Sequence, residues 1–146
     1  MERETFYAEY DGSRIACMRF GEGLTDVVWL PAQFTHLDLM WADKGIRDFL
    51  ERFGEHTRLV YFDKLGAGLS DPVSSIPTLE DRIGELSAVM DAAGLERAAI
   101  IGASEGATAA MGFASMYPER VTRLVLLSPL AFPPIPEVLE LSLIHI

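Results

Sequence analysis

Asparagine is absent from the 146 residues, and cysteine occurs once, as Cys17. Without asparagine the chain has no acceptor for N-glycosylation. A single cysteine forms no intramolecular disulfide, which favours a reducing compartment. Histidine is scarce too, with three residues, and no HExxH, CxxC or grouped histidine–carboxylate pattern indicates a metal site. We therefore expect a cytoplasmic protein that uses no metal and no other cofactor.

Long apolar runs and an excess of basic residues are also missing. The longest apolar stretches, Val27–Leu30 and Leu124–Leu127, fall far short of the ~18 residues of a membrane span. Twelve Lys and Arg against 22 Asp and Glu give a net charge of −10, which repels nucleic-acid backbones and anionic membranes. The sequence therefore predicts neither a nucleic-acid partner nor membrane binding, and it leaves the oligomeric state open.

What the sequence does contain is enough apolar material for one folded domain, 49% hydrophobic against 23% charged residues. Asp11-Gly12 between two strand-like runs predicts an antiparallel hairpin. Short apolar strands then alternate with helical patterns. The expected strands are 5–10, 14–19, 27–30, 59–62, 98–101 and 121–127, and the expected helices are 41–53, a helix after the N-cap Thr78, and 105–117. This order predicts an α/β fold with a mostly parallel sheet and antiparallel opening strands.

The strongest chemical signal is the segment Gly102-Ala103-Ser104-Glu105-Gly106, which lies directly between an apolar strand and a helix. In this setting G-x-S-x-G indicates a nucleophile elbow. Small neighbours let strand and helix approach, and the serine is presented at a helix amino terminus that favours negative charge. The alternative is that Ser104 merely caps the helix. We favour Ser104 as a catalytic nucleophile.

An oxyanion hole needs a second backbone N–H, usually from the loop after the first parallel strand. The backbone N–H groups of Gln33 and Glu105 are the candidate pair, and an ordinary strand-to-helix turn is the alternative for Gln33. His36 follows in the same loop and is a candidate substrate contact, against the simpler interpretation as a loop side chain. His56 lies in a polar turn and is expected to face solvent.

The glycine-containing segment 63–71 follows another apolar strand. Its spacing matches neither a Walker loop nor a dinucleotide-binding loop, so we interpret it as a structural turn. Asp63 and Asp71 are expected to bind backbone groups there rather than to act as catalysts.

The order of these features resembles the α/β-hydrolase superfamily over nearly the whole chain. A smaller set of residues is similar to the corresponding residues of hydrolases found joined to adenylate or guanylate cyclase domains. That set comprises Pro31, His36–Trp41, Phe62–Lys64 and Ser104–Gly106. The chain departs from the family pattern at three places. Pro31-Ala32 stands where many relatives have His-Gly, although proline is common there in the cyclase-associated subgroup. Leu65 stands where an arginine is usual, and Ala107 stands where a third glycine is frequent.

The resemblance implies a triad in the order serine, acid, histidine. Only His145 follows Ser104, a short way beyond the last expected strand. We therefore expect residues 1–140 to be a partial α/β-hydrolase domain, truncated after about the sixth strand and inactive by itself. Residues 141–146 are interpreted as a non-native tail.

The leading hypothesis is an esterase-like serine hydrolase that acts, in its complete form, on an ester or related carbonyl compound. A non-catalytic ligand-sensing or interaction domain, cyclase-linked in the narrower resemblance, is the alternative. A third hypothesis is a haloperoxidase- or lyase-type member of the same fold. In the leading case the resemblance implies a small-molecule substrate as partner and no cofactor.

Overall fold

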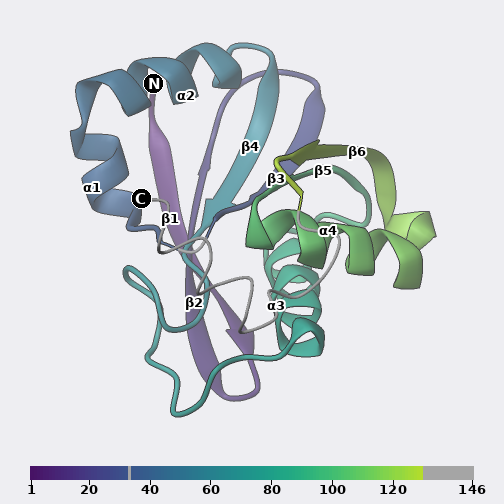
Figure 1. Ribbon diagram of the computed structural model, residues 1–146. Helices are drawn as coiled ribbons and strands as arrows, with labels where there is room; N and C mark the ends of the chain where they lie inside the picture. Colours follow the sequence, from purple (N-terminus) through teal and green to yellow (C-terminus); the bar gives the residue numbers. More distant parts are fainter. Residues whose placement is uncertain (33, 130–146) are drawn as a thin grey trace, which may run out of the picture.

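The computed structural model describes residues 1–32 and 34–129, in which six strands form one sheet in the order β1-β2-β4-β3-β5-β6 (Figure 1). The strands are β1 (Arg3–Tyr10), β2 (Ser13–Phe20), β3 (Thr25–Leu30), β4 (Thr57–Phe62), β5 (Ala98–Ala103) and β6 (Val121–Leu127). The helices are α1 (Leu37–Ala42), α2 (Lys44–Gly54), α3 (Leu79–Ala92), α4 (Glu105–Met116) and the 3-10 helix η1 (Pro118–Arg120). The proposed tail 141–146 and the end of the proposed domain lie outside the described residues.

The pairing of neighbouring strands changes from antiparallel to parallel at β4. β1 and β2 form the expected hairpin, because Asp11 and Gly12 adopt positive φ angles of 48° and 74° in the turn. β2 pairs antiparallel with β4, whereas β4, β3, β5 and β6 run parallel to one another. The predicted α/β fold with antiparallel opening strands is confirmed.

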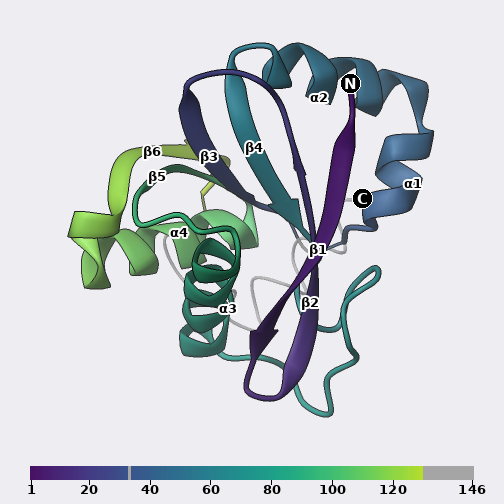
Figure 2. The ribbon, with the colours of Figure 1, turned by 180° about the vertical axis from the view of Figure 1, so that it is seen from behind.

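Helices cover both faces of this sheet: α3 and α4 lie on one face, and α1 and α2 on the other (Figures 1 and 2). Neighbouring residues of the central strands point to opposite faces, as the pleat requires. Val28, Val60 and Ile100 therefore join the core under α3 and α4. Their neighbours Val27, Leu59 and Ile101 join the core under α1 and α2. Burial on both faces explains the continuous apolar runs of the sequence.

The helix expected over 41–53 is in fact two helices, so the predicted start was wrong. Asp43 has an extended backbone, φ −71° and ψ 122°, and it ends α1. Its Oδ1 accepts a hydrogen bond of 2.8 Å from the Ile46 N–H and thereby caps α2. Aspartate is favoured at a helix start, where its carboxylate accepts hydrogen bonds from free backbone N–H groups, and it is disfavoured in a helix interior. This preference explains the break at Asp43.

The N-cap expected at Thr78 is confirmed. Its Oγ1 accepts from the Asp81 N–H at 3.1 Å, and Asp81 Oδ2 accepts from the Thr78 N–H at 2.8 Å. This reciprocal capping box fixes where α3 begins. Gly94, with φ 71°, follows the helix at its carboxyl end, as expected.

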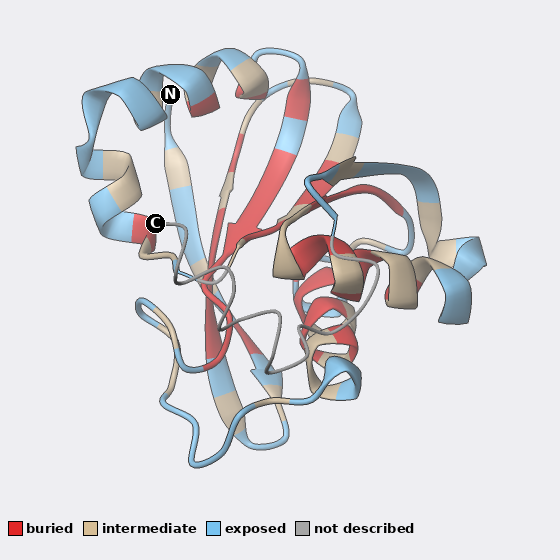
Figure 3. Ribbon diagram, in the orientation of Figure 1, coloured by how far each residue is buried: buried red, intermediate tan, exposed pale blue. Residues whose placement is uncertain are grey.

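At one side the described part of the sheet ends with β6, whose residues are mostly exposed (Figure 3). Leu124, Val125 and Leu127 keep 38%, 43% and 44% of their surface accessible. The carboxyl ends of the parallel strands meet at one edge, and the loops that leave this edge carry the residues singled out by the sequence.

Candidate active site

Ser104 occupies the turn between β5 and α4 with φ 53° and ψ −118°. A residue other than glycine is strained in this region by about 1–3 kcal/mol. Its backbone N–H donates a hydrogen bond of 2.9 Å to the Leu127 carbonyl oxygen, which ties the turn to the end of β6. The Ser104 side chain forms no capping hydrogen bond with α4, so the helix-cap interpretation is wrong. The strained turn required by a nucleophile elbow is present.

The glycines on either side of Ser104 permit very close packing. A Cβ atom on Gly102 would lie 2.6 Å from the Ala107 Cα. A Cβ atom on Gly106 would lie 2.8 Å from the Leu30 carbonyl oxygen and closer still to that of Pro31. Backbone therefore meets backbone at this point, and only glycine fits. The spacing of the motif follows from this contact between α4 and the end of β3.

Glu105 is the first residue of α4, where backbone N–H groups have no partner within the helix. Because Pro31 packs against Gly106, the loop after β3 begins beside this helix end. Gln33, the other candidate oxyanion donor, lies outside the described residues. The pairing of the Gln33 and Glu105 N–H groups stays a prediction.

Asp63 follows β4 and is completely buried. Its Oδ2 accepts from the Leu37 N–H at 3.1 Å and from the Leu69 N–H at 2.9 Å. The carboxylate thus joins the segment after β3 to the turn after β4. Asp71 accepts from the Arg14 N–H at 2.8 Å, and this hydrogen bond lowers the pKa of Asp71. Both aspartates bind backbone groups, as expected.

Sequence reasoning missed a group of charged side chains beside the turn. Lys64 Nζ lies 2.8 Å from Glu105 Oε2, and Arg82 Nε lies 3.6 Å from Glu105 Oε1. Arg82 Nη1 also donates to Glu85 Oε1 at 2.8 Å. Burial lowers the pKa of Lys64 and raises that of Glu85, while their oppositely charged partners oppose both shifts. A polar residue on the otherwise apolar face of α3, Glu85, was the available sequence signal.

The three histidines have different outcomes. His36 is half-buried and caps α1, where its Nδ1 accepts from the Leu39 N–H at 3.5 Å; a contact with substrate stays a prediction. His56 is exposed, as expected. His145 lies outside the described residues.

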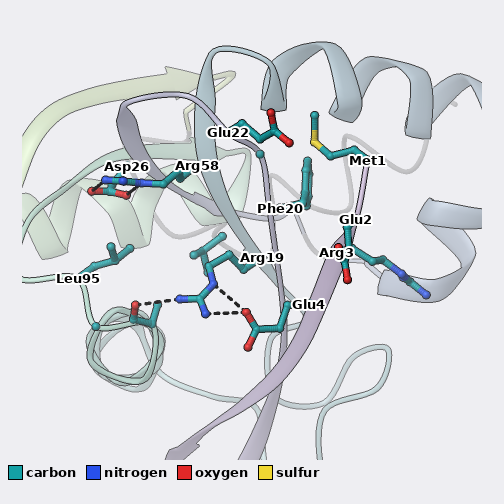
Figure 4. A pocket seen from close by; sticks show the side chains of 14 residues that line it. Met1, Glu2, Arg3, Glu4, Arg19, Phe20, Glu22, Asp26, Arg58 and Leu95 are labelled. Atoms are coloured by element: carbon teal, nitrogen blue, oxygen red, sulfur yellow. Dashed lines mark hydrogen bonds and ion pairs between the residues drawn. The ribbon is translucent and has the colours of Figure 1, made fainter.

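A cavity of about 800 Å³ opens at the opposite edge of the sheet, near the amino ends of the parallel strands (Figure 4). Four of its charged side chains pair with one another: Arg19 lies 2.6 Å from Glu4, and Arg58 lies 2.7 Å from Asp26. The cavity is therefore separate from the Ser104 turn.

Within residues 1–32 and 34–129, no cluster of metal-ligating side chains occurs. No helix in this described part is long and apolar enough to cross a membrane.

Comparison with known proteins gives one family. A family model for the alpha/beta hydrolase fold matches residues 27–143. A proline iminopeptidase of Xylella fastidiosa is 35% identical over 86 residues, which are 56% of this chain and 28% of that enzyme. A 2-hydroxy-6-oxononadienedioate/2-hydroxy-6-oxononatrienedioate hydrolase of Paraburkholderia phymatum is 39% identical over 87 residues, 54% of this chain and 30% of that enzyme.

Among solved structures, the carboxylesterase CesB of Bacillus subtilis is similar, with a TM-score of 0.75 and 26% identity. The similarity covers 98% of this chain and 50% of the esterase chain. The chain thus spans about half the length of that structure and less than a third of the length of the two curated relatives.

Proposed function

Because the chain belongs to the α/β-hydrolase family, we propose that Ser104 is the nucleophile of an esterase-like hydrolase, in the complete natural protein that carries this chain. The observation that supports this most directly is the backbone of Ser104, φ 53° and ψ −118°, at the junction of β5 and α4. Strain of this kind concentrates at functional sites. The Ser104 side chain makes no capping hydrogen bond with α4, so capping does not explain why a serine occupies this position.

In the proposed reaction, Ser104 Oγ attacks the carbonyl carbon of an ester or related substrate and loses its proton to a base. The N–H groups of Gln33 and Glu105 stabilise the negative oxygen of the tetrahedral intermediate. The base gives this proton to the alcohol oxygen as the C–O bond breaks and the alcohol leaves, and water then hydrolyses the acyl-serine. We place the acid and the histidine base after β6, in line with the order serine, acid, histidine. The residues 1–129 would then need that later part for turnover.

A fluorophosphonate probe tests the nucleophile, because it forms a covalent bond with activated serines. We expect the complete natural protein to be labelled at Ser104 and the Ser104→Ala variant to be unlabelled. Ser115→Ala is the matched control, since Ser115 is exposed in the same helix, far from the turn, and its loss should leave labelling unchanged. Folded protein that stays unlabelled, or labelling that survives Ser104→Ala, would contradict the proposal.

Labelling together with an assay of p-nitrophenyl ester hydrolysis separates the alternatives. A ligand-sensing domain, including one joined to a cyclase, would keep the fold but need no activated serine. A haloperoxidase- or lyase-type member would react with the probe and yet fail to hydrolyse simple esters. The narrower resemblance to cyclase-associated hydrolases stays a prediction, and the sequence that follows these residues in the natural protein tests it.

A further inference from the structure

The residue next to Ser104 carries a negative charge that two other segments hold in place. Glu105 Oε2 accepts from Lys64 Nζ at 2.8 Å, and Glu105 Oε1 lies 3.6 Å from Arg82 Nε. Lys64 follows β4, and Arg82 belongs to α3. One oxygen of the Glu105 carboxylate is thus hydrogen-bonded to Lys64, and the other faces Arg82 in a longer ion pair; both cations are distant from Glu105 in the sequence.

The burial of the Lys64 ammonium group costs free energy that a purely structural contact would not require. Only 4% of its side chain is exposed, whereas 44% of the Glu105 side chain is exposed. Burying an ammonium group costs several kcal/mol before pairing, and apolar side chains often fill such space with no loss of stability. The position of the positive charge, rather than packing alone, thus requires an explanation.

The sheet order supplies the relevant geometry. β3 lies between β4 and β5, so the Lys64–Glu105 pair spans the carboxyl end of β3. The loop that leaves this end carries the candidate donor Gln33, and Glu105 itself carries the other candidate N–H. Without a partner, the Glu105 carboxylate would repel the negative oxygen that these N–H groups stabilise.

We propose that Lys64 is a positioning residue of the active site, which holds the Glu105 carboxylate and offsets its charge so that the Glu105 N–H can serve a negative oxygen. This inference rests on the proposed function, because it assigns that N–H to the oxyanion hole. Arg82 gives a second, longer ion pair to the same carboxylate. Arg82 Nη1 donates hydrogen bonds to Glu85 Oε1 at 2.8 Å and to the Leu65 carbonyl oxygen at 3.1 Å. These bonds hold the Arg82 guanidinium in place, so it does not move closer to Glu105 to replace Lys64.

A double-mutant cycle in the complete natural protein tests the role of the charge. Lys64→Met leaves the Glu105 carboxylate without its closest cation, so we expect kcat for a p-nitrophenyl ester to fall by about 10-fold or more with little change in KM. Adding Glu105→Gln removes the repelling charge, so Lys64→Met/Glu105→Gln should recover most of the lost kcat. Lys44→Met is the matched control, because Lys44 is 80% exposed in a surface pair with Asp48, and its kcat should not change.

The comparison stays informative if Lys64→Met alone does not fold. In the Glu105→Gln background no unpaired carboxylate arises, and Lys64→Met should there lower kcat by less than about threefold. A loss of about 10-fold in that background, at an unchanged melting temperature, would overturn the inference. Equal losses in Lys64→Met and in the double variant would also overturn it, since Lys64 would then act by packing alone.

Failure of this inference differs from failure of the proposed function. If Ser104→Ala keeps full turnover, the nucleophile assignment is wrong. If Ser104→Ala abolishes turnover and Lys64→Met behaves as the wild type, only the role of Lys64 is wrong.

Discussion

The contact between α4 and the end of β3 makes a quantitative prediction for Gly106→Ala. The added Cβ would lie 2.8 Å from the Leu30 carbonyl oxygen and closer still to the Pro31 carbonyl oxygen. Both obstacles are backbone atoms, which no rotamer change can move. Overpacking of this kind costs about 1–3 kcal/mol, occasionally more, while replacing glycine by alanine in a helix gains up to about 1 kcal/mol. Because both contacts are with backbone atoms, we expect the cost of overpacking to lie near the upper end of its range. The net loss in the free energy of unfolding should then be about 1–3 kcal/mol.

Gly112→Ala provides the matched control, because Gly112 lies in the same helix and the chemical change is identical. Its Cβ would lie 2.6 Å from Ile83 Cδ1, the tip of a flexible side chain. A strained or altered rotamer there costs about 0.5–1.5 kcal/mol, which the gain in helix propensity largely offsets. We expect the free energy of unfolding to change by less than about 0.5 kcal/mol.

Urea unfolding of the two variants and the wild type, followed by circular dichroism, measures both values at once. Gly106→Ala should also slow fluorophosphonate labelling of Ser104, since α4 must shift away from Pro31. If the two variants unfold at the same urea concentration, the close backbone contact does not limit the packing of α4, and our explanation of the glycine spacing is refuted.

Two further predictions concern single residues of the described structure. Both Ser104→Gly and Ser104→Ala lose the hydroxyl, but only glycine adopts the positive φ without strain. We therefore expect the free energy of unfolding in urea to be about 1–3 kcal/mol higher for Ser104→Gly than for Ser104→Ala. Equal stabilities would show that the turn is unstrained. Burial raises the pKa of the Cys17 thiol from 9.0 to about 12, so native protein should resist iodoacetamide at pH 8.5 and react once unfolded, as peptide mass spectrometry can measure. Between pH 9 and about 12 the unfolded chain releases this proton and the native chain keeps it, so the contribution of Cys17 should make the protein less stable as pH rises; rapid native labelling would contradict the burial of the thiol.

The sequence predicted the sheet well, because burial of the central strands on both faces leaves continuous apolar runs such as Val27–Leu30. It predicted the turn at Ser104 for a similar reason: the small residues around it reflect a close approach of backbone to backbone. It missed the break between α1 and α2 and predicted one helix over 41–53, because the aromatic spacing across Trp41 and Phe49 continues through Asp43. The capping role of Asp43 depends on the path of the chain in three dimensions.

The contact between Lys64 and Glu105 beside Ser104 was missed for a different reason. Charged side chains are mostly exposed in proteins, so a lysine next to an aspartate in a turn predicts a solvated surface. Asp63 and Lys64 are instead both buried, and they reach to different segments: Asp63 binds the Leu37 N–H after β3, and Lys64 binds Glu105 after β5. Lys64 and Glu105 are 41 positions apart, and only the strand order β4-β3-β5 brings them together. Two adjacent residues thus connect the turn after β4 to both segments proposed to stabilise the oxyanion, which is why we expect changes at Lys64 to alter catalysis as well as stability.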